Sequence, residues 1–502
     1  MKRLIAMIIV VSTLVFIRSG FAEEAFKGIK IEFLGEDAGE SMKYATEGGG
    51  MIQLSGFPTF PNQDGWPVEI EAPFNLNAFG GKPIVADFIQ GDNGEKEVIY
   101  AMGDDLHTFQ VYVYSLYGVL ENGWPLQLDG NYIQGGETMM LGDIDGDRID
   151  ELVIALDIYS QGQGYRPHVY VIENDLTVRD WPIPNGITSF LHPVLANLDY
   201  SLDGSKEIIV RTLEYLNVYD GDGNVVDGFP VVLDNRGAAP VAGDVDNDGE
   251  MEIVVVDDFG PVRIIGHSGI VEAVVPLGEF VRRTPVLGDI DNDGYLEIVI
   301  PQNNDGIIYV FSHELEQEAG WPFVADSVGI PSALSLGNVT ADPGLEVIFH
   351  AHCGNLFLLR SDGTLIWQKH LEELDATGRN GITVGDVNND RKKEILMSGD
   401  GMVVALTPQG DYAEGFPFSV EGLRCNGTSE VILDDIDEDS DLELIFTDNY
   451  TAWAEPGLHY INIIDVPSQF RKALNDWSIF QHDYQRSGLV STLRRYERAF
   501  DE

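Results

Sequence analysis

Cysteine and basic residues are both scarce in this chain. Two cysteines in 502 residues, Cys353 and Cys425, are too few for a disulfide framework, and either a pair or two separate thiols fits the sequence. Lysine and arginine total 30 against 83 aspartates and glutamates, so the formal net charge is −53. Such an acidic chain repels nucleic acid and anionic membrane surfaces and attracts divalent cations. We therefore expect no nucleic-acid partner.

Long hydrophobic runs are missing as well, with one short exception. The apolar stretch 4–17 follows two basic residues and precedes Gly20-Phe21-Ala22. It is shorter than the roughly 20 residues that a membrane-spanning helix needs. This layout is typical of a secretory signal peptide over residues 1–22, with an uncleaved anchor as the alternative. We expect an exported protein, secreted, periplasmic or at the cell surface, that acts as a monomer.

One acidic phrase recurs eight times along the chain. Its clearest copies are GDVDNDGEMEIVVV at 243–256 and GDIDNDGYLEIVI at 288–300, where alternate acidic residues and a glutamate precede an apolar run. The copies start at residues 87, 143, 197, 244, 289, 338, 386 and 435, so they are 45 to 56 residues apart. This spacing suits a four-stranded β-propeller blade and excludes the nine-residue turn of a calcium-binding β-helix.

A second marker keeps step with the acidic phrase. It is Gly-aromatic-Pro or Trp-Pro, and it occurs at 65–67, 123–125, 181–182, 228–230, 320–322 and 415–417. Short apolar segments lie between the markers, as at 240–242, 253–256, 262–265 and 271–275. Four short antiparallel strands cannot bury both of their faces alone, whereas blades stacked around an axis can.

The repeats predict an all-β fold, an eight-bladed β-propeller of four-stranded antiparallel blades over residues 50–466, with seven blades as the alternative. After the last acidic phrase the chain lacks a final strand with its Gly-aromatic-Pro marker, and residues 51–67 contain that element. An open ring would leave an unpaired strand edge. We therefore expect an N-terminal strand to close the ring, with 23–49 as an N-terminal segment and 467–502 as a C-terminal tail.

Each acidic phrase contains the ligand types of a calcium site. Calcium takes six to eight oxygen ligands from carboxylates, carbonyls and water. Asp244, Asp246 and Asp248 offer oxygens at positions 1, 3 and 5 of one phrase, and Glu252 closes it at position 9. An EF-hand has its closing glutamate at position 12, where this phrase has Val255, so that family is excluded. Solvated turns without a cation are the alternative, because aspartate and asparagine are common in turns.

Five copies have the full ligand set. The expected calcium ligands are Asp143, Asp145, Asp147, Glu151, Asp244, Asp246, Asp248, Glu252, Asp289, Asp291, Asp293, Glu297, Asp386, Asn388, Asp390, Glu394, Asp435, Asp437, Asp439 and Glu443. A weaker, longer copy offers Asn197, Asp199, Asp203 and Glu207. Ile89 and Thr340 replace the position-3 carboxylate in two further copies, where we expect weak binding. Repetition along one rim favours several structural calcium ions over a single catalytic one.

The phrase DxDxDGxxE before a β-strand, repeated at blade spacing, resembles the FG-GAP/VCBS repeat family of β-propellers. That family includes the integrin α-subunit head and many exported bacterial proteins. The resemblance covers residues 50–466, and the tail DWSIFQHDYQRSG at 476–488 is similar to a short segment that follows many bacterial members. It implies that the loop residues above bind calcium and that the protein serves in recognition, as in cell adhesion or carbohydrate binding.

The loops between blades hold an unusual share of the basic residues. Alignment of the repeats places on the face opposite the acidic loops Lys82, His192, Arg236, Arg282, Arg283, Arg379 and Arg424. A guanidinium suits carboxylates and sugar hydroxyls. The alternative is that each arginine pairs with a nearby acid such as Asp104, Asp257, Asp258 or Asp448. His350 and His352 share a strand face, which suggests either a transition-metal site or an ordinary hairpin.

These observations predict an exported, calcium-stabilised β-propeller that binds an extracellular glycan or protein. No residue is assigned a catalytic role. The alternative is a calcium-dependent polysaccharide lyase acting on acidic pectic glycans, because an arginine-rich face suits uronates, with His192 or His350 as its candidate base. A purely structural envelope component is a third possibility.

Overall fold

The computed structural model describes only part of the chain in detail. The described residues are 42–45, 51–54, 63–71, 79–80, 82–89, 94–103, 108–129, 139–160, 164–184, 193–198, 204–325, 329–330, 334–351, 354–371, 381–399, 402–419, 430–450, 458–471 and 489–490. They include no helix that is long and apolar enough to cross a membrane. The chain divides into two compact units, Met1–Phe57 and Pro58–Glu502. The first contains a hairpin of β1 (Met42–Ala45) and β2 (Met51–Leu54).

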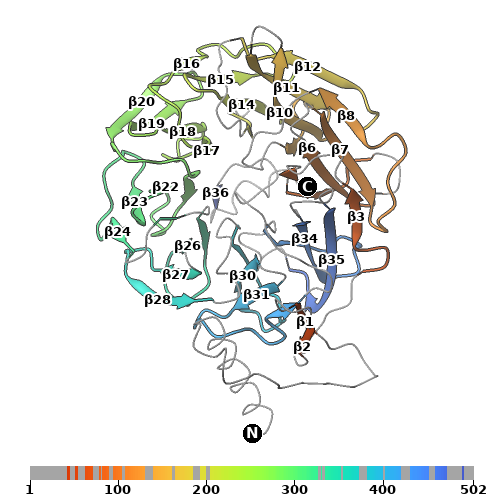
Figure 1. The fold of residues 1–502 in the computed structure, drawn as a ribbon. Helices are drawn as coiled ribbons and strands as arrows, with labels where there is room; N and C mark the ends of the chain where they lie inside the picture. Colours follow the sequence, from red (N-terminus) through yellow and green to blue (C-terminus); the bar gives the residue numbers. More distant parts are fainter. Residues whose placement is uncertain are drawn as a thin grey trace. The chain divides into compact units, whose positions relative to one another are not determined.

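The second unit is an eight-bladed β-propeller, and its blades form a ring (Figure 1). Blade 1 consists of β5 (Ile84–Ala86), β6 (Glu97–Gly103), β7 (Thr108–Ser115) and β8 (Leu126–Asp129), and blade 2 of β9 (Met139–Gly142), β10 (Glu151–Ser160), β11 (Gly164–Ile172) and β12 (Val178–Pro182). Blade 3 consists of β13 (Val194–Ala196), β14 (Glu207–Arg211), β15 (Tyr215–Tyr219) and β16 (Val231–Val232), and blade 4 of β17 (Val241–Gly243), β18 (Glu252–Val256), β19 (Pro261–Gly266) and β20 (Val271–Pro276). In blade 1, β4 (Phe79–Gly80) also pairs with β6.

Blades 5 to 8 repeat the pattern. Blade 5 consists of β21 (Val286–Gly288), β22 (Glu297–Pro301), β23 (Ile307–Phe311) and β24 (Phe323–Val324), and blade 6 of β25 (Ser335–Gly337), β26 (Glu346–Ala351), β27 (Asn355–Leu359) and β28 (Leu365–His370). Blade 7 consists of β29 (Thr383–Gly385), β30 (Glu394–Gly399), β31 (Met402–Leu406) and β32 (Phe418–Ser419), and blade 8 of β33 (Ile432–Asp434), β34 (Asp441–Tyr450), β35 (Leu458–Gln469) and β3 (Val68–Glu71). From blade 2 to blade 8 the first strands of neighbouring blades contact one another, and the first strand of each blade lies on its inner side.

The ring is closed by an N-terminal strand, as the sequence predicts, but this strand is β3, which begins just after the predicted segment 51–67, and Met51–Leu54 pair with β1 instead. β3 is the outer strand of blade 8 and pairs antiparallel with β35, with Val68 opposite Ile461 and Glu71 opposite Leu458. The prediction of eight four-stranded blades is therefore confirmed, and the alternative of seven is wrong. Closure pairs the strand edge that an open ring would expose.

The hydrophobic core lies between adjacent blades. Val194 and Ile209 of blade 3 pack with Val255 and Ile265 of blade 4 in one buried cluster. Inner strands are covered on both faces by neighbouring blades, so β18 is buried along its whole length and has the apolar run that the acidic phrase introduces. The outer strand β20 alternates between exposed and half-buried residues, because one of its faces meets water.

The Gly-aromatic-Pro marker forms a contact between blades. Trp66 of blade 8 donates its indole N–H to the carbonyl of Leu116 in blade 1, at 2.7 Å. Trp321 of blade 5 donates to the carbonyl of Ser361 in blade 6, at 3.0 Å. The glycine before Trp321, Gly320, has a φ of +93°, and a Cβ there would lie 2.1 Å from the carbonyl oxygen of Asp362. Only glycine allows the neighbouring blade to approach so closely.

Replacing Gly320 with alanine should therefore destabilise the protein twice, through the positive φ and through the clash with Asp362. We expect a loss of more than about 2 kcal/mol, since backbone strain alone costs about 1–3 kcal/mol. Gly278 is the matched control, because its φ is +74° and a Cβ there meets nothing within 4 Å. Urea unfolding of both variants gives the measurement, and equal losses would contradict a role in blade contact.

A short segment of the C-terminal tail returns to the inner edge of blade 5. β36 (Leu489–Val490) pairs in parallel with β21, with Leu489 opposite Leu287 and Val490 opposite Gly288. It lies inside the ring of blades (Figure 1). Nothing in the repeats predicted this strand, and the motif at 476–488 falls outside the described residues.

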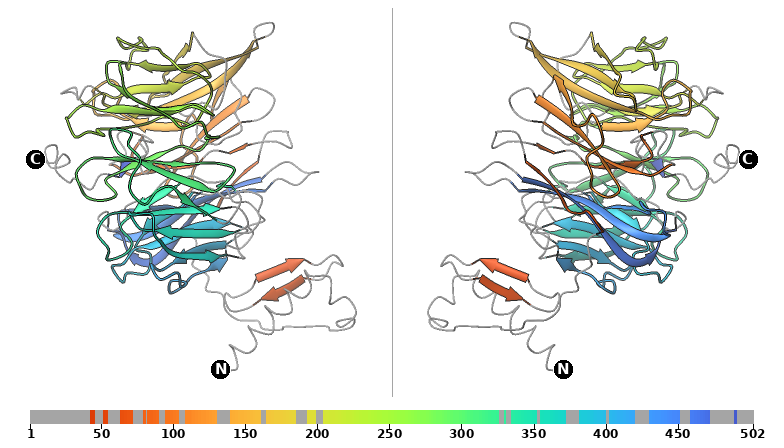
Figure 2. Two further views of the ribbon diagram at one scale, coloured as in Figure 1. Left: turned by 90° about the vertical axis from the view of Figure 1, so that its left-hand side faces the viewer. Right: turned by 90° about the vertical axis from the view of Figure 1, so that its right-hand side faces the viewer.

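The topology gives the propeller two different faces. The strands of each blade run between these faces, as the side views show (Figure 2). Antiparallel order therefore brings every turn from a first strand to a second strand to one face. The hairpins from second to third strands, and the loops between blades, lie on the other face.

Candidate metal loops and the opposite face

All eight acidic loops connect the first strand of a blade to its second strand, so they share one face. In each loop the glutamate at or near the start of the second strand accepts a hydrogen bond, through Oε2, from the backbone N–H of loop position 2. The bonds are Phe88–Glu97 2.8 Å, Ile144–Glu151 3.0 Å, Leu198–Glu207 2.8 Å, Val245–Glu252 2.8 Å, Ile290–Glu297 2.8 Å, Val339–Glu346 2.9 Å, Val387–Glu394 3.1 Å and Ile436–Glu443 2.8 Å. The glutamate thus shapes the loop, a role that the spacing alone did not reveal.

Backbone N–H groups also orient the aspartates. In the loop at 244, Asp244 accepts bonds from Asp248 N at 3.0 Å and Gly249 N at 3.1 Å. Asp246 accepts from Asp248 N at 3.2 Å, and Asp248 accepts from Glu250 N at 2.8 Å. The same local chemistry makes asparagine and aspartate turn residues. It holds several carboxylates at fixed positions around one loop.

In four loops the carboxylates converge. Three residues of each can bring oxygens within 4.8 Å of one another, namely Asp143, Asp145 and Glu151; Asp244, Asp246 and Asp248; Asp289, Asp291 and Glu297; and Asp435, Asp437 and Glu443. The remaining predicted acids of these loops, Asp147, Glu252, Asp293 and Asp439, are not part of these groups. Several acidic groups could therefore hold a metal ion.

Two buried oxygens support this fit to a cation. Oδ1 of Asp386 and Oδ1 of Asp435 are buried and have no hydrogen-bond partner among the described residues. Buried polar atoms are nearly always paired, so an unpaired carboxylate oxygen points to a ligand of opposite charge or to water. The donors of these loops are all oxygens, which a hard divalent cation such as calcium prefers.

Burial perturbs the loop glutamates strongly. Loss of hydration raises the pKa of Glu151, Glu252, Glu297 and Glu394 to about 8, and of Glu443 to about 9. The neighbouring aspartates raise these pKa values further, while the backbone N–H bond opposes the shift. A bound dication would reverse the shift, because it stabilises the ionised form.

This gives a prediction for the chelated protein. The folded pKa values of about 8 lie above the ordinary glutamate value of 4.5, so these glutamates favour folding most below pH 4.5. Their contribution is lost as pH rises from there through about 8. In EGTA we expect the melting temperature to fall between pH 5 and about 8, and to fall less in calcium. Parallel pH profiles with and without calcium would contradict ion binding at these glutamates.

In two acidic loops, neighbouring side chains bond to the carboxylates. Arg471 lies 3.2 Å from Oδ2 of Asp386 through Nη1, and donates to Asn389 at 2.6 Å. In the loop at 338, Arg360 bonds to Asp342 at 2.8 Å, and Thr340 donates its hydroxyl to the second oxygen of Glu346. The contacts of Arg360 and Thr340 occupy carboxylate oxygens of Asp342 and Glu346 that a cation would otherwise use as ligands. Weak binding at the loop with Thr340 stays a prediction.

On the opposite face the predicted basic residues divide into groups. Lys82 pairs with Glu430 at 2.8 Å. Arg236 and Arg282 instead share Asp258, with Nε–Oδ2 distances of 3.4 and 2.9 Å. His350 is buried and Arg283 is half-buried. The remaining candidates lie outside the described residues, and they are His192, His352, Arg379 and Arg424. The sequence left open the alternative that the arginines pair with nearby acids. The structure shows such a pairing for Arg236 and Arg282, which share Asp258.

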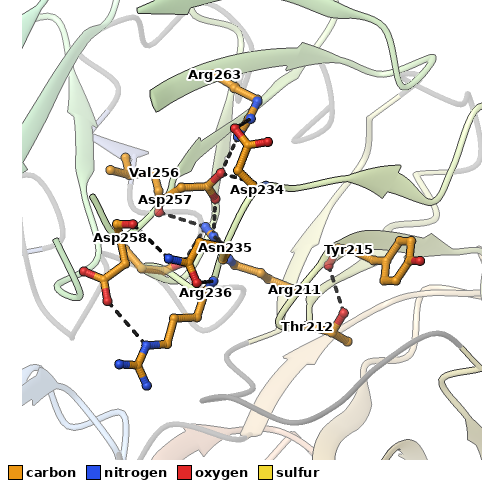
Figure 3. Close-up of polar contacts among 11 residues, drawn as sticks. Arg211, Thr212, Tyr215, Asp234, Asn235, Arg236, Val256, Asp257, Asp258 and Arg263 are labelled. Atoms are coloured by element: carbon orange, nitrogen blue, oxygen red, sulfur yellow. Dashed lines mark hydrogen bonds and ion pairs between the residues drawn. The ribbon is translucent and has the colours of Figure 1, made fainter. Parts of the chain in front are cut away.

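A buried ionic joint between blades 3 and 4 escaped the sequence analysis (Figure 3). Arg211 at the end of β14 bonds to Asp257 and donates to the carbonyls of Val256 at 2.9 Å and Asn235 at 2.9 Å. Arg263 on β19 bonds to Asp257 at 2.5 Å and to Asp234 at 2.5 Å. Since these residues come from two blades, the joint fixes how the blades meet. No local sequence pattern predicts these ion pairs.

Together the fold and the loops define an eight-bladed β-propeller with candidate metal sites on one face. Similar solved structures include the rhamnogalacturonan lyase YesW, with 14% sequence identity and a TM-score of 0.58 over 91% of this chain and 86% of that one. The Bacillus licheniformis rhamnogalacturonan lyase PL11 is 15% identical, with a TM-score of 0.58 over 88% of this chain and 83% of that one. At such identities the likeness concerns the fold alone. No family model and no curated protein matches the chain.

Proposed function

We propose that this protein is an exported β-propeller, held rigid by several calcium ions, that binds an extracellular glycan. The observation that carries the proposal is the division between the two faces. One face has an acidic loop in every blade, with a glutamate that bonds to the backbone N–H of loop position 2, and in four of these loops the carboxylates converge. The loops of the other face differ in sequence from blade to blade, and two of the described ones hold Arg236 and Arg282, whose side chains are 46% and 29% exposed. Such variation on a rigid scaffold is where ligands bind.

Calcium is the ion that these donors favour. The converging groups are carboxylates without histidine or cysteine, which suits a hard cation and not zinc. Extracellular calcium modules bind with dissociation constants of about 10⁻⁴ to 10⁻³ M. Export, which the pattern of residues 1–22 predicts, would place the chain where calcium reaches such concentrations. Repetition of the loop around the ring favours a structural role.

A polysaccharide lyase is the second candidate, because solved lyases have this fold over most of the chain. A lyase needs a base that abstracts the proton next to a uronate carboxylate, beside a group that stabilises the resulting charge. Arg236 and Arg282 supply the second requirement. Of the two candidate bases, His350 is buried in β26, and His192 lies outside the described residues. The binding function therefore has more direct support.

One experiment separates these functions. The full chain without residues 1–22, in calcium, is applied to an array of plant and bacterial glycans, and bound polysaccharides are then followed by ultraviolet absorbance for unsaturated uronate. Binding without product supports the binding function. Release of an unsaturated product would show that the protein is a lyase. Absence of both binding and product would contradict the proposal.

A further inference from the structure

We propose that the hairpin between β18 and β19, with the loop that follows β20, forms a subsite for a uronate residue. Phe259 and Phe280 provide an apolar surface for the sugar ring, and Arg236 and Arg282 bind its carboxylate. The inference rests on the proposed glycan-binding function, and it specifies the class of sugar. It concerns the face opposite the acidic loops, so it does not involve the candidate calcium ligands.

Phe259 stands out because its conformation is unfavourable and nevertheless fixed. Its side chain is 64% exposed, and its φ is +56°, where bulky residues are strained. Its N–H donates to the carbonyl of Glu279 at 2.8 Å, and Gly260 N donates to the carbonyl of Asp257 at 3.0 Å. Neither an exposed phenyl ring nor a strained backbone helps the chain to fold. Strain of this kind gathers at binding sites.

The ring of Phe259 belongs to a larger aromatic surface. Its centroid lies 5.4 Å from that of Phe280, at an angle of 50°. Arg282 lies over Phe280, with its guanidinium carbon 4.6 Å from the ring centroid. Aromatic rings combine apolar area with little loss of conformational entropy on binding. The apolar C–H face of a sugar ring can stack on such a surface.

Asp258 positions both arginines toward the same place. It is buried, and its Oδ2 contacts Nε of Arg282 at 2.9 Å and Nε of Arg236 at 3.4 Å. Both contacts use Nε, and no bond to a described residue occupies the terminal Nη groups of either arginine. The side chain of Arg236 is 46% exposed, and that of Arg282 is 29% exposed. Figure 3 shows Arg236 extending away from the buried Arg211–Asp257 joint.

Charge selects an anionic ligand at this place. Asp258 serves two guanidinium groups, so Asp258, Arg236 and Arg282 together carry a net positive charge in a chain whose net charge is −53. The carboxylate of nearby Glu279 accepts a hydrogen bond from the hydroxyl of Tyr309, and among the described residues it forms no ion pair with Arg236 or Arg282. Guanidinium groups bind carboxylates through paired N–H donors. A ligand with both a carboxylate and an apolar ring face uses the whole subsite, and a uronate has both.

The test measures binding of trigalacturonate by calorimetry in calcium buffer, with neutral galactotriose for comparison. We expect the wild-type protein to prefer trigalacturonate, and Arg236→Gln, Arg282→Gln and Phe259→Gly each to weaken binding about tenfold, the effect of losing one charged hydrogen bond or ring contact. Phe259→Gly should leave the melting temperature unchanged or higher, because glycine adopts a positive φ without strain. This separates a binding role from a structural one.

Tyr117→Ala is the matched control, because Tyr117 is an exposed aromatic residue in the turn between β7 and β8, on the face of the acidic loops. It should bind trigalacturonate like the wild type. Unchanged binding in the three variants, or equal binding of the neutral trisaccharide, would overturn the subsite. If the wild type binds other glycans but not trigalacturonate, the subsite is wrong and the glycan-binding function stands. If it binds no glycan on the array, the function itself is wrong.

Discussion

Calcium is expected to raise the melting temperature of this protein by on the order of 10 °C relative to EGTA. A ligand that binds only the folded state stabilises it by RT ln(1 + [L]/Kd), which gives about 2.3 kcal/mol per site at about 5 mM calcium and a Kd of about 10⁻⁴ M. Four loops have converging carboxylates, so the sum is about 9 kcal/mol. For a domain of this size, about 1 kcal/mol corresponds to about 1 °C. Scanning calorimetry gives the measurement.

Single-loop variants assign the effect to the loops. Asp289→Asn removes one converging carboxylate and should reduce the calcium-dependent gain by about one site's share. Asp222→Asn is the control, since Asp222 is an exposed acid in the turn between β15 and β16, outside the acidic loops. It removes the same charge and should leave the gain intact. The same melting temperature in EGTA and in calcium would show that the loops are solvated turns, the alternative left open by the sequence.

Asp257→Ala is expected to destabilise the propeller by about 3–5 kcal/mol, because it breaks a buried ion cluster and leaves a buried charge unpaired. Asp257 is 0% exposed, bonds to Arg211 and Arg263, and accepts from Asp234 N at 3.1 Å. Without it, Arg211 at the junction of blades 3 and 4 loses its carboxylate partner. Urea unfolding in calcium measures the loss.

Asp234→Ala is the matched control for this variant. Asp234 bonds to the same Arg263, but its side chain is 70% exposed. Exposed ion pairs contribute about 0–1 kcal/mol, so the loss should be several-fold smaller. Similar losses in the two variants would show that burial of Asp257 adds nothing and that the joint does not hold the blades together.

The fold and the acidic loops could be predicted because their signals are local and repeated. A strand buried on both faces needs a continuous apolar run, and a tight loop of oxygen donors needs aspartates, asparagines and glutamate at set positions. Both requirements are met within one short segment, as in 243–256, and they recur at blade spacing. Closure by residues before the first loop followed from the missing strand of blade 8, which β3 supplies.

Contacts between loops of different blades could not be predicted in this way. Arg471 reaches Asp386 from 85 positions away, and Asp258 holds Arg236 and Arg282 from two different loops between blades. The parallel strand β36 and the joint around Asp257 are also of this kind. Local periodicity specifies how each blade folds, but the neighbours of a loop side chain depend on how the blades pack when the ring closes. The partners of Arg236 and Arg282, on the face opposite the acidic loops, are therefore decided only by the assembled propeller.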